Sequence, residues 1–196
     1  MKLAYKITAG AALAFASTLS PAMAQDCTFD KKADAFEQAD VDRLYGCVSD
    51  RLAAGYAAND HAVGSVYRTW KATSIGPAAP GPHGDRFLFT FANDVAYEQY
   101  VKYADEGGFS MPVGSVLAKE SFKLSKKGTP RNGPLFIMTK VAAGEADEFD
   151  NWVYSAVQPK GKVMKIKQSF CHDCHAVFED QDSLGYPDYD VRFETE

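Results

Sequence analysis

A five-residue run near the carboxyl end, Cys171-His172-Asp173-Cys174-His175, constrains this chain more than any other feature. Two cysteines three positions apart, followed directly by a histidine, form the attachment signature of c-type haem. The two thiols can form thioethers with the haem vinyl groups, while the histidine binds the iron. The sequence therefore predicts covalently attached haem c, with Cys171 and Cys174 as attachment sites and His175 as the iron ligand.

The same residues are compatible with two other kinds of site, a zinc half-site and a thiol redox pair. A zinc site needs a second pair of ligands, and the remaining candidates are widely scattered along the chain. They are Cys27, Cys47, His61 and His83. This scatter favours haem, and neither His61 nor His172 is expected to be a ligand.

Residues 1–24 have the order of a cleavable secretory signal. Lys2 and Lys6 precede an apolar stretch over residues 9–19, and small residues follow it. That stretch is too short for a membrane helix, and no later run approaches the roughly 20 apolar residues that a span needs. We therefore expect an exported chain without a membrane span, which is periplasmic if the source is bacterial.

Residues 25–196 are expected to form a single haem domain, because this length suits one core that can enclose most of a haem. The chain has a formal net charge of −5 at pH 7. We interpret its Lys and Arg residues as dispersed along the sequence. This distribution argues against nucleic acid as a partner.

Cys27 and Cys47 are left over from the haem signature, and an oxidising compartment favours a disulfide between them. On one straight helix they would lie about 30 Å apart, so the chain must turn between them. Asp40 is an expected N-cap for a helix over residues 41–56, and a short helix over 29–38 could fold back on it. The predicted disulfide staples these N-terminal helices and takes no part in chemistry.

The middle of the chain has the composition of β-structure. Breaker residues make 75–84 an expected loop, and residues 93–105 an expected helix. The turn-rich residues 128–134 suggest an antiparallel connection. The expected strands are 86–91, 115–124, 135–141 and 152–157.

The haem motif comes last, on an expected helix over 170–178. Small electron-transfer cytochromes have a methionine ligand after the motif, whereas residues 176–196 contain none. A methionine ligand would have to come from upstream, so plain electron transfer, which needs a firm sixth ligand, is disfavoured. The strands do not suit a four-helix bundle. We predict an α+β fold, a mainly antiparallel β-sheet with N-terminal helices and a C-terminal haem-bearing helix, whose iron lacks a strong distal protein ligand.

With its motifs in this order, the chain resembles the cytochrome P460 family. The resemblance implies a homodimer with a β-rich subunit and five-coordinate c-type haem. The namesake enzymes oxidise hydroxylamine, and an extra lysine bond joins their haem to the protein. The related cytochromes c′-β lack that bond and bind nitric oxide or carbon monoxide. The matching segments are 67–70, 82–84, 111–114, 115–120, 133–134 and 152–175, together with Asn93, Met138 and Lys140.

In the namesakes the lysine lies in a Gly-x-x-x-x-Lys-Glu stretch, which Gly114 to Glu120 matches. By this resemblance Lys119 is the candidate for the haem crosslink, although a lysine on a strand is usually solvated. Alternation puts Lys119 and Glu120 on opposite faces, with Glu120 among apolar neighbours. Burial would raise the pKa of Glu120, which could then relay protons or instead bond a neighbouring residue.

Two functions remain open. In the first, an oxidoreductase oxidises hydroxylamine or a related nitrogen oxide, with Lys119 and Glu120 as catalytic residues and an external electron acceptor. In the second, a non-catalytic module binds nitric oxide or carbon monoxide. The position of Lys119 favours the enzyme. His83 is expected in a turn, or alternatively in the distal pocket or a dimer contact.

Overall fold

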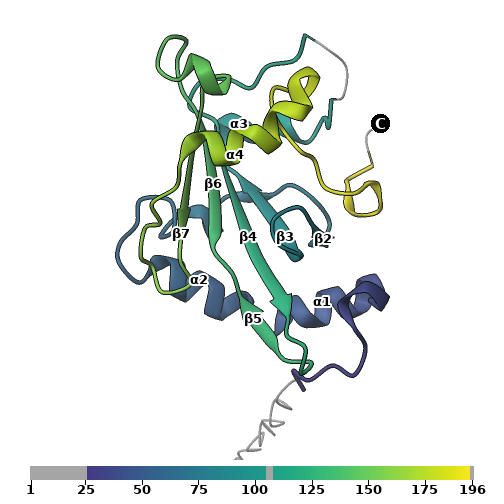
Figure 1. The fold of residues 1–196 in the computed structure, drawn as a ribbon. Coiled ribbons are helices and arrows are strands. Elements are labelled where there is room, and N and C mark those ends of the chain that lie inside the picture. The colour runs from purple at the N-terminus through teal and green to yellow at the C-terminus, as the bar shows by residue number, and fades with distance from the viewer. Residues whose placement is uncertain (1–25, 105–107, 195–196) are drawn as a thin grey trace, which may run out of the picture.

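The computed structural model describes residues 26–104 and 108–194, so the predicted signal segment lies outside the described residues. Its centre is a seven-stranded antiparallel sheet with the order β1-β3-β4-β6-β7, in which β2 also pairs with β3 and β5 with β4 (Figure 1). The strands are β1 (Lys71–Ala72), β2 (Ala78–Gly81), β3 (Arg86–Ala92), β4 (Val116–Leu124), β5 (Pro130–Asn132), β6 (Leu135–Lys140) and β7 (Trp152–Val157). The α-helices are α1 (Gln38–Gly46), α2 (Ser49–Ala57), α3 (Asp94–Tyr100) and α4 (Gln168–His175). The predicted α+β class is confirmed.

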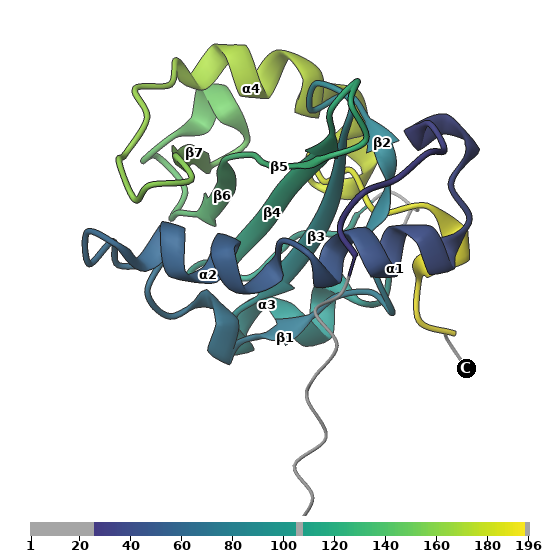
Figure 2. The same ribbon diagram turned by 90° about the horizontal axis from the view of Figure 1, so that it is seen from below.

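The sheet separates two layers of helices, as Figure 2 shows, with α1 and α2 on one side and α4 on the other. Because side chains alternate along a strand, each strand contributes to both layers. Phe87, Ala118 and Ile137 pack with the core of α1 and α2, whereas Leu117 and Tyr154 belong to the second core, which Cys171 of α4 joins. Among the helices of the described residues, none has the length and apolar character that crossing a membrane requires.

The N-terminal helices differ from the prediction. Residues 29–38 do not form an α-helix, since only Ala33–Ala35 make a 3-10 turn. The expected helix over 41–56 is divided into α1 and α2, because Gly46 favours a helix end and Val48 has φ −121°. Asp40 is not the N-cap but lies in the first turn, where its carboxylate accepts a hydrogen bond from the backbone N–H of Glu37 at 3.3 Å.

Several other boundaries also differ. The expected loop over 75–84 contains β2, which tolerates Pro80 because it lies outside the main strand order and needs no second ladder of hydrogen bonds. The turn-rich 128–134 contains β5. Helix α3 ends at Tyr100, and Tyr103 has φ +47°, a left-handed conformation that stops a helix; Asp105 lies outside the described residues. The four expected strands correspond to β3, β4, β6 and β7.

Candidate functional site

Helix α4 carries the Cys171 to His175 motif and is fastened to the edge strand β7. Gln168, the first residue of the helix, accepts a hydrogen bond from the backbone N–H of Tyr154 at 2.7 Å and donates one to its carbonyl at 2.8 Å. The helix ends at His175, and a 3-10 segment over Ala176–Gln181 follows, whereas the expected helix covered 170–178. This double clamp fixes the motif against the second core of the sheet.

One backbone contact sets the orientation of the His175 ring. Its Nδ1 atom lies 2.8 Å from the carbonyl oxygen of Ser183, so Nδ1 is the protonated ring nitrogen and donates this hydrogen bond. The Nε2 atom is then left as the electron-pair donor, which is the form of imidazole that binds a metal. A hydrogen bond from the ring nitrogen that does not bind the metal is the usual way in which proteins orient a ligating histidine.

Ser183 is held in turn by a network of polar side chains, most of them buried. Its hydroxyl donates to Asp150 at 2.6 Å. The preceding residue, Asp182, pairs with Lys140 at 2.6 Å and accepts a hydrogen bond on its backbone carbonyl from the indole N–H of Trp152 at 2.8 Å. The sequence does not reveal these residues as parts of the site, because the group that touches His175 is a backbone carbonyl, which every residue carries.

The residues present fit a haem c. Cys171 and Cys174 are free cysteines on one helix, so both are available for thioethers. The hydroxyl of Tyr154, whose ring centroid lies 5.3 Å from that of His175, is buried without a hydrogen-bond partner, as a residue that faces an additional group would be. The structure therefore supplies two attachment thiols, one oriented imidazole and an unsatisfied hydroxyl in one place.

The alternative kinds of site receive less support. Burial raises the pKa of Cys171, which disfavours the thiolate that a redox-active thiol needs. Cys27 and Cys47 are joined in a disulfide with their Cα atoms 5.8 Å apart, so neither can complete a zinc site. Within residues 26–104 and 108–194, no three His, Cys, Asp or Glu side chains surround a common metal position.

Lys119 lies on the sheet face that α4 covers. It pairs across the sheet with Phe136 of β6, whose ring lies 5.0 Å from the His83 ring, and the His83 ring in turn lies 6.1 Å from that of His175. Burial lowers the pKa of Lys119 to about 8. Burial, reinforced by the charge of Lys119, also lowers the pKa of His83 to about 3 and that of His175 to about 4, so both rings are neutral at pH 7.

Glu120 points to the opposite face, as the strand alternation predicted. Its side chain is fully buried under α1 and α2, where it accepts hydrogen bonds from the hydroxyls of Tyr45 and Tyr67 and pairs with Arg68 at 2.7 Å. Burial raises the pKa of Glu120 even though Arg68 favours the ionised form. The structure therefore does not bring Glu120 together with the haem motif, and its hydrogen-bond partners are side chains of the other core.

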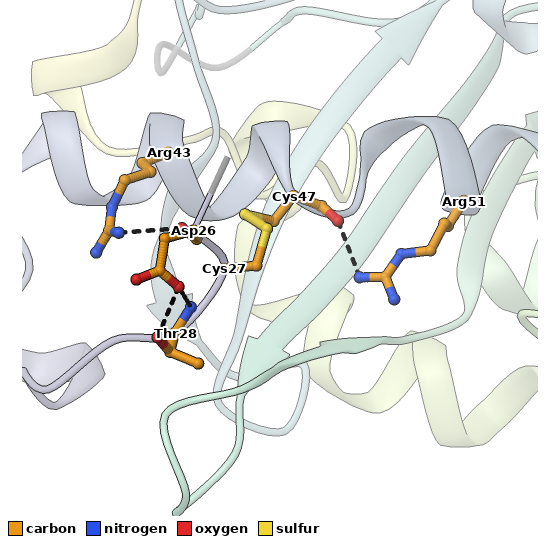
Figure 3. Close-up of a disulfide and its surroundings, with 6 residues drawn as sticks. All are labelled: Asp26, Cys27, Thr28, Arg43, Cys47 and Arg51. Atoms are coloured by element: carbon orange, nitrogen blue, oxygen red, sulfur yellow. Dashed lines mark hydrogen bonds between the residues drawn. A yellow bond between two sulfur atoms is a disulfide. The ribbon is translucent and has the colours of Figure 1, made fainter. Parts of the chain in front are cut away.

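The remaining candidates make contacts of other kinds. Nδ1 of His61 accepts hydrogen bonds from the N–H groups of two residues in its own turn, which explains its place in the loop after α2. His172, at a variable position of the motif, lies beside Phe149, with the ring centroids 5.5 Å apart. The predicted Cys27–Cys47 disulfide is present, and it fastens the N-terminal segment to the end of α1 (Figure 3).

The comparisons with known proteins agree with this geometry. The family model described as Cytochrome P460 matches residues 65–184. The matched region begins after α2 and extends through α4 to the residue after Ser183, so it contains the whole sheet and the haem motif. No curated protein matches the chain.

Proposed function

The chain belongs to the cytochrome P460 family, and from this premise we propose that it oxidises hydroxylamine or a related nitrogen oxide at a five-coordinate c-type haem. The family makes it a haem c protein. The finer proposal is an exported homodimer, periplasmic if the source is bacterial, that passes electrons to an external acceptor. The observation that supports catalysis is the position of Lys119 on the same face of the sheet as the haem motif.

The bound haem would supply an iron that binds the substrate and accepts its electrons. Cys171 and Cys174 would hold this group covalently, and both lie on the helix that Gln168 fastens to β7. His175 would bind the iron through Nε2, because the Ser183 carbonyl keeps the proton on Nδ1. These residues bind and orient, so they are needed for either of the two functions.

Lys119 is the residue that separates the two functions. A pKa of about 8 leaves an appreciable fraction of its amine neutral at pH 7, and a neutral amine is a nucleophile. Lys119 would then hold the haem through Nζ, in addition to the two cysteine thioethers.

A second function, reversible binding of nitric oxide or carbon monoxide, is favoured by the position of Glu120. Oxidation of hydroxylamine releases protons, and a carboxylate on the substrate side would accept them. Glu120 lies on the opposite face of the sheet, whereas Phe136 and the neutral His83 lie beside Lys119. Apolar and uncharged side chains of this kind suit an uncharged gas.

A peptide map of the purified holoprotein tests the proposal. Recovery of haem attached both to the Cys171–Cys174 peptide and to the Lys119 peptide supports the enzyme. The same preparation should reduce a dye acceptor when hydroxylamine is added, and its reduced form should have a strongly red-shifted Soret band. Replacement of Lys119 by Leu should abolish turnover while the haem stays attached through the cysteines.

Lys123 provides the matched control, because it lies on the same strand and the same side but is exposed. Lys123→Leu should keep both the crosslink and turnover. A free Lys119 in the wild-type protein, together with tight binding of nitric oxide and no turnover, would replace the enzyme by the gas-binding function.

A further inference from the structure

A run of exposed lysines leads into the haem-bearing helix. Lys160, Lys162, Lys165 and Lys167 are all exposed, and we call them the lysine strip. Residues 151–172 contain no Asp or Glu, although the whole chain has a net charge of −5. The expectation that basic residues are dispersed is therefore wrong for this segment, because counting charges over the whole chain hides a local excess.

The lysine strip lies along the free edge of the sheet. Val163 forms a β-bridge with Val157, and the backbone N–H of Met164 donates to the carbonyl of Ala156 at 2.8 Å. A turn precedes this bridge, closed by the N–H of Gln158 and the carbonyl of Lys162 at 2.8 Å. In Figure 1 the segment follows β7 upward to α4. Backbone pairing therefore holds the strip in a defined place beside the haem motif.

No acidic side chain of the described residues lies within ion-pair distance of the lysine strip, although other lysines of this chain do form ion pairs. Lys31 pairs with Asp40, for example, at 2.9 Å. The positive charge of the strip is thus uncompensated. In a protein of net negative charge, such a patch attracts negatively charged partners and steers their approach.

Large apolar side chains are exposed in the same segment. Val163 is 55% exposed and Phe170 is 77% exposed. Phe170 directly precedes Cys171, and Cys174 is itself exposed, so this apolar surface adjoins the point at which the haem would be attached. Apolar contacts with charged groups around them are typical of protein interfaces.

We propose that the lysine strip, together with Val163 and Phe170, is the docking surface for an acidic protein that accepts electrons from the haem. This proposal rests on the proposed function, because the need for an external electron acceptor follows from it. Each encounter transfers one electron, so the reduced protein is oxidised by one equivalent and the acceptor is reduced by one. The excess of charge over apolar area is typical of weak, short-lived redox complexes that weaken with salt.

A protein partner is favoured over an anionic membrane surface because of the position of Phe170. Positive charge alone would suit either partner. Only electron transfer, however, requires the docking surface to lie next to the haem, and Phe170 is adjacent in sequence to the attachment residue Cys171.

Stopped-flow oxidation of the dithionite-reduced holoprotein tests the proposal, with oxidised plastocyanin, an acidic blue-copper protein, as the probe. The variant K162Q/K165Q/K167Q should lower the second-order rate constant about tenfold at low ionic strength, and the difference should vanish at high salt. The matched control is K123Q/K126Q/K127Q, which removes three exposed lysines near the turn between β4 and β5. This control should change the rate less than twofold.

The result distinguishes this proposal from the proposed function. Hydroxylamine oxidation with a small dye acceptor should be equal in both triple variants and in the wild type. The wild type could lack this turnover and still react with plastocyanin faster than K162Q/K165Q/K167Q at low salt. That result would contradict the proposed enzyme function and support the docking surface. Equal plastocyanin rates in the two triple variants overturn the docking surface.

The lysine strip could instead bind a membrane surface or a second copy of this chain. Each alternative predicts a different result, and either result would overturn the proposal. The wild type could sediment with phosphatidylglycerol vesicles while K162Q/K165Q/K167Q does not, with equal plastocyanin rates for both. This result would assign the strip to a membrane surface. A change from dimer to monomer in the same variant during analytical ultracentrifugation would assign it to a second copy of this chain.

Discussion

Lys140 and Asp182 form an ion pair of 2.6 Å, with side chains only 8% and 9% exposed. Asp182 directly precedes Ser183, whose backbone carbonyl accepts the hydrogen bond from His175. The ammonium group also donates to the backbone carbonyl of Asp150 at 2.8 Å. The pair therefore joins three segments that are distant in sequence, β6, the turn before β7 and the turn after α4. Its burial makes it sensitive to the loss of either partner.

Replacement of Lys140 by Met should destabilise the fold by about 3 to 5 kcal/mol, because it leaves the carboxylate of Asp182 buried without its partner. The Ser183 carbonyl should also become less well placed. A weaker hydrogen bond at Nδ1 makes His175 a poorer electron donor, so the reduction potential of the holoprotein should become more positive. Denaturant unfolding and spectroelectrochemistry measure the two effects.

Lys71 offers the control, since its pair with Glu98 is 3.5 Å long and its side chain is 57% exposed. Lys71→Met should cost less than about 1 kcal/mol and leave the potential unchanged. An unchanged potential in Lys140→Met, in a variant shown to be destabilised, would mean that the pair is structural and does not act on His175.

Replacement of Glu120 by Gln should cost about 2 to 3 kcal/mol, because Arg68 and the hydroxyls of Tyr45 and Tyr67 lose a charged acceptor. The visible spectrum of the haem and the turnover of hydroxylamine should not change, because Glu120 faces the other side of the sheet. Loss of turnover with a native unfolding midpoint would restore Glu120 as a proton relay. Glu98→Gln, at an exposed position, is the control.

Local patterns explain which parts of this fold and site could be predicted. The opposite orientation of Lys119 and Glu120 follows from strand alternation alone, and the haem motif is contiguous in sequence. The contact between His175 and Ser183 could not be predicted, because it uses a backbone carbonyl beyond the end of α4. The division into α1 and α2 at Val48 could not be predicted either, since an apolar repeat at helical spacing, from Leu44 through Val48 to Leu52, runs through it.

Removal of the disulfide by C27S/C47S should cost about 3 kcal/mol, since the bond closes a loop of 20 residues in the unfolded chain. Haem attachment should be retained, because the disulfide belongs to the α1 side of the sheet, opposite α4. Figure 3 shows a suitable control nearby, Thr28, whose hydroxyl donates to Asp26 at an exposed position. Thr28→Val should cost less than about 0.5 kcal/mol. Equal losses in both variants would contradict a specific role for the disulfide.

Gly55 in α2 gives a prediction whose sign depends on a single contact. In an exposed helix, Gly→Ala stabilises by about 1 kcal/mol. Here the added Cβ would lie 2.1 Å from the carbonyl oxygen of Pro159, the residue that precedes the lysine strip. Overlap with a backbone atom forces a shift, so Gly55→Ala should instead destabilise by about 1 to 3 kcal/mol.

Gly81 is the control for this prediction, because a Cβ added there has no atom within 4 Å. Gly81→Ala should be neutral or stabilising by up to about 1 kcal/mol through the unfolded state. Thermal unfolding of both variants decides the sign. A more stable Gly55→Ala protein would show that α2 and the turn at Pro159 are further apart than described.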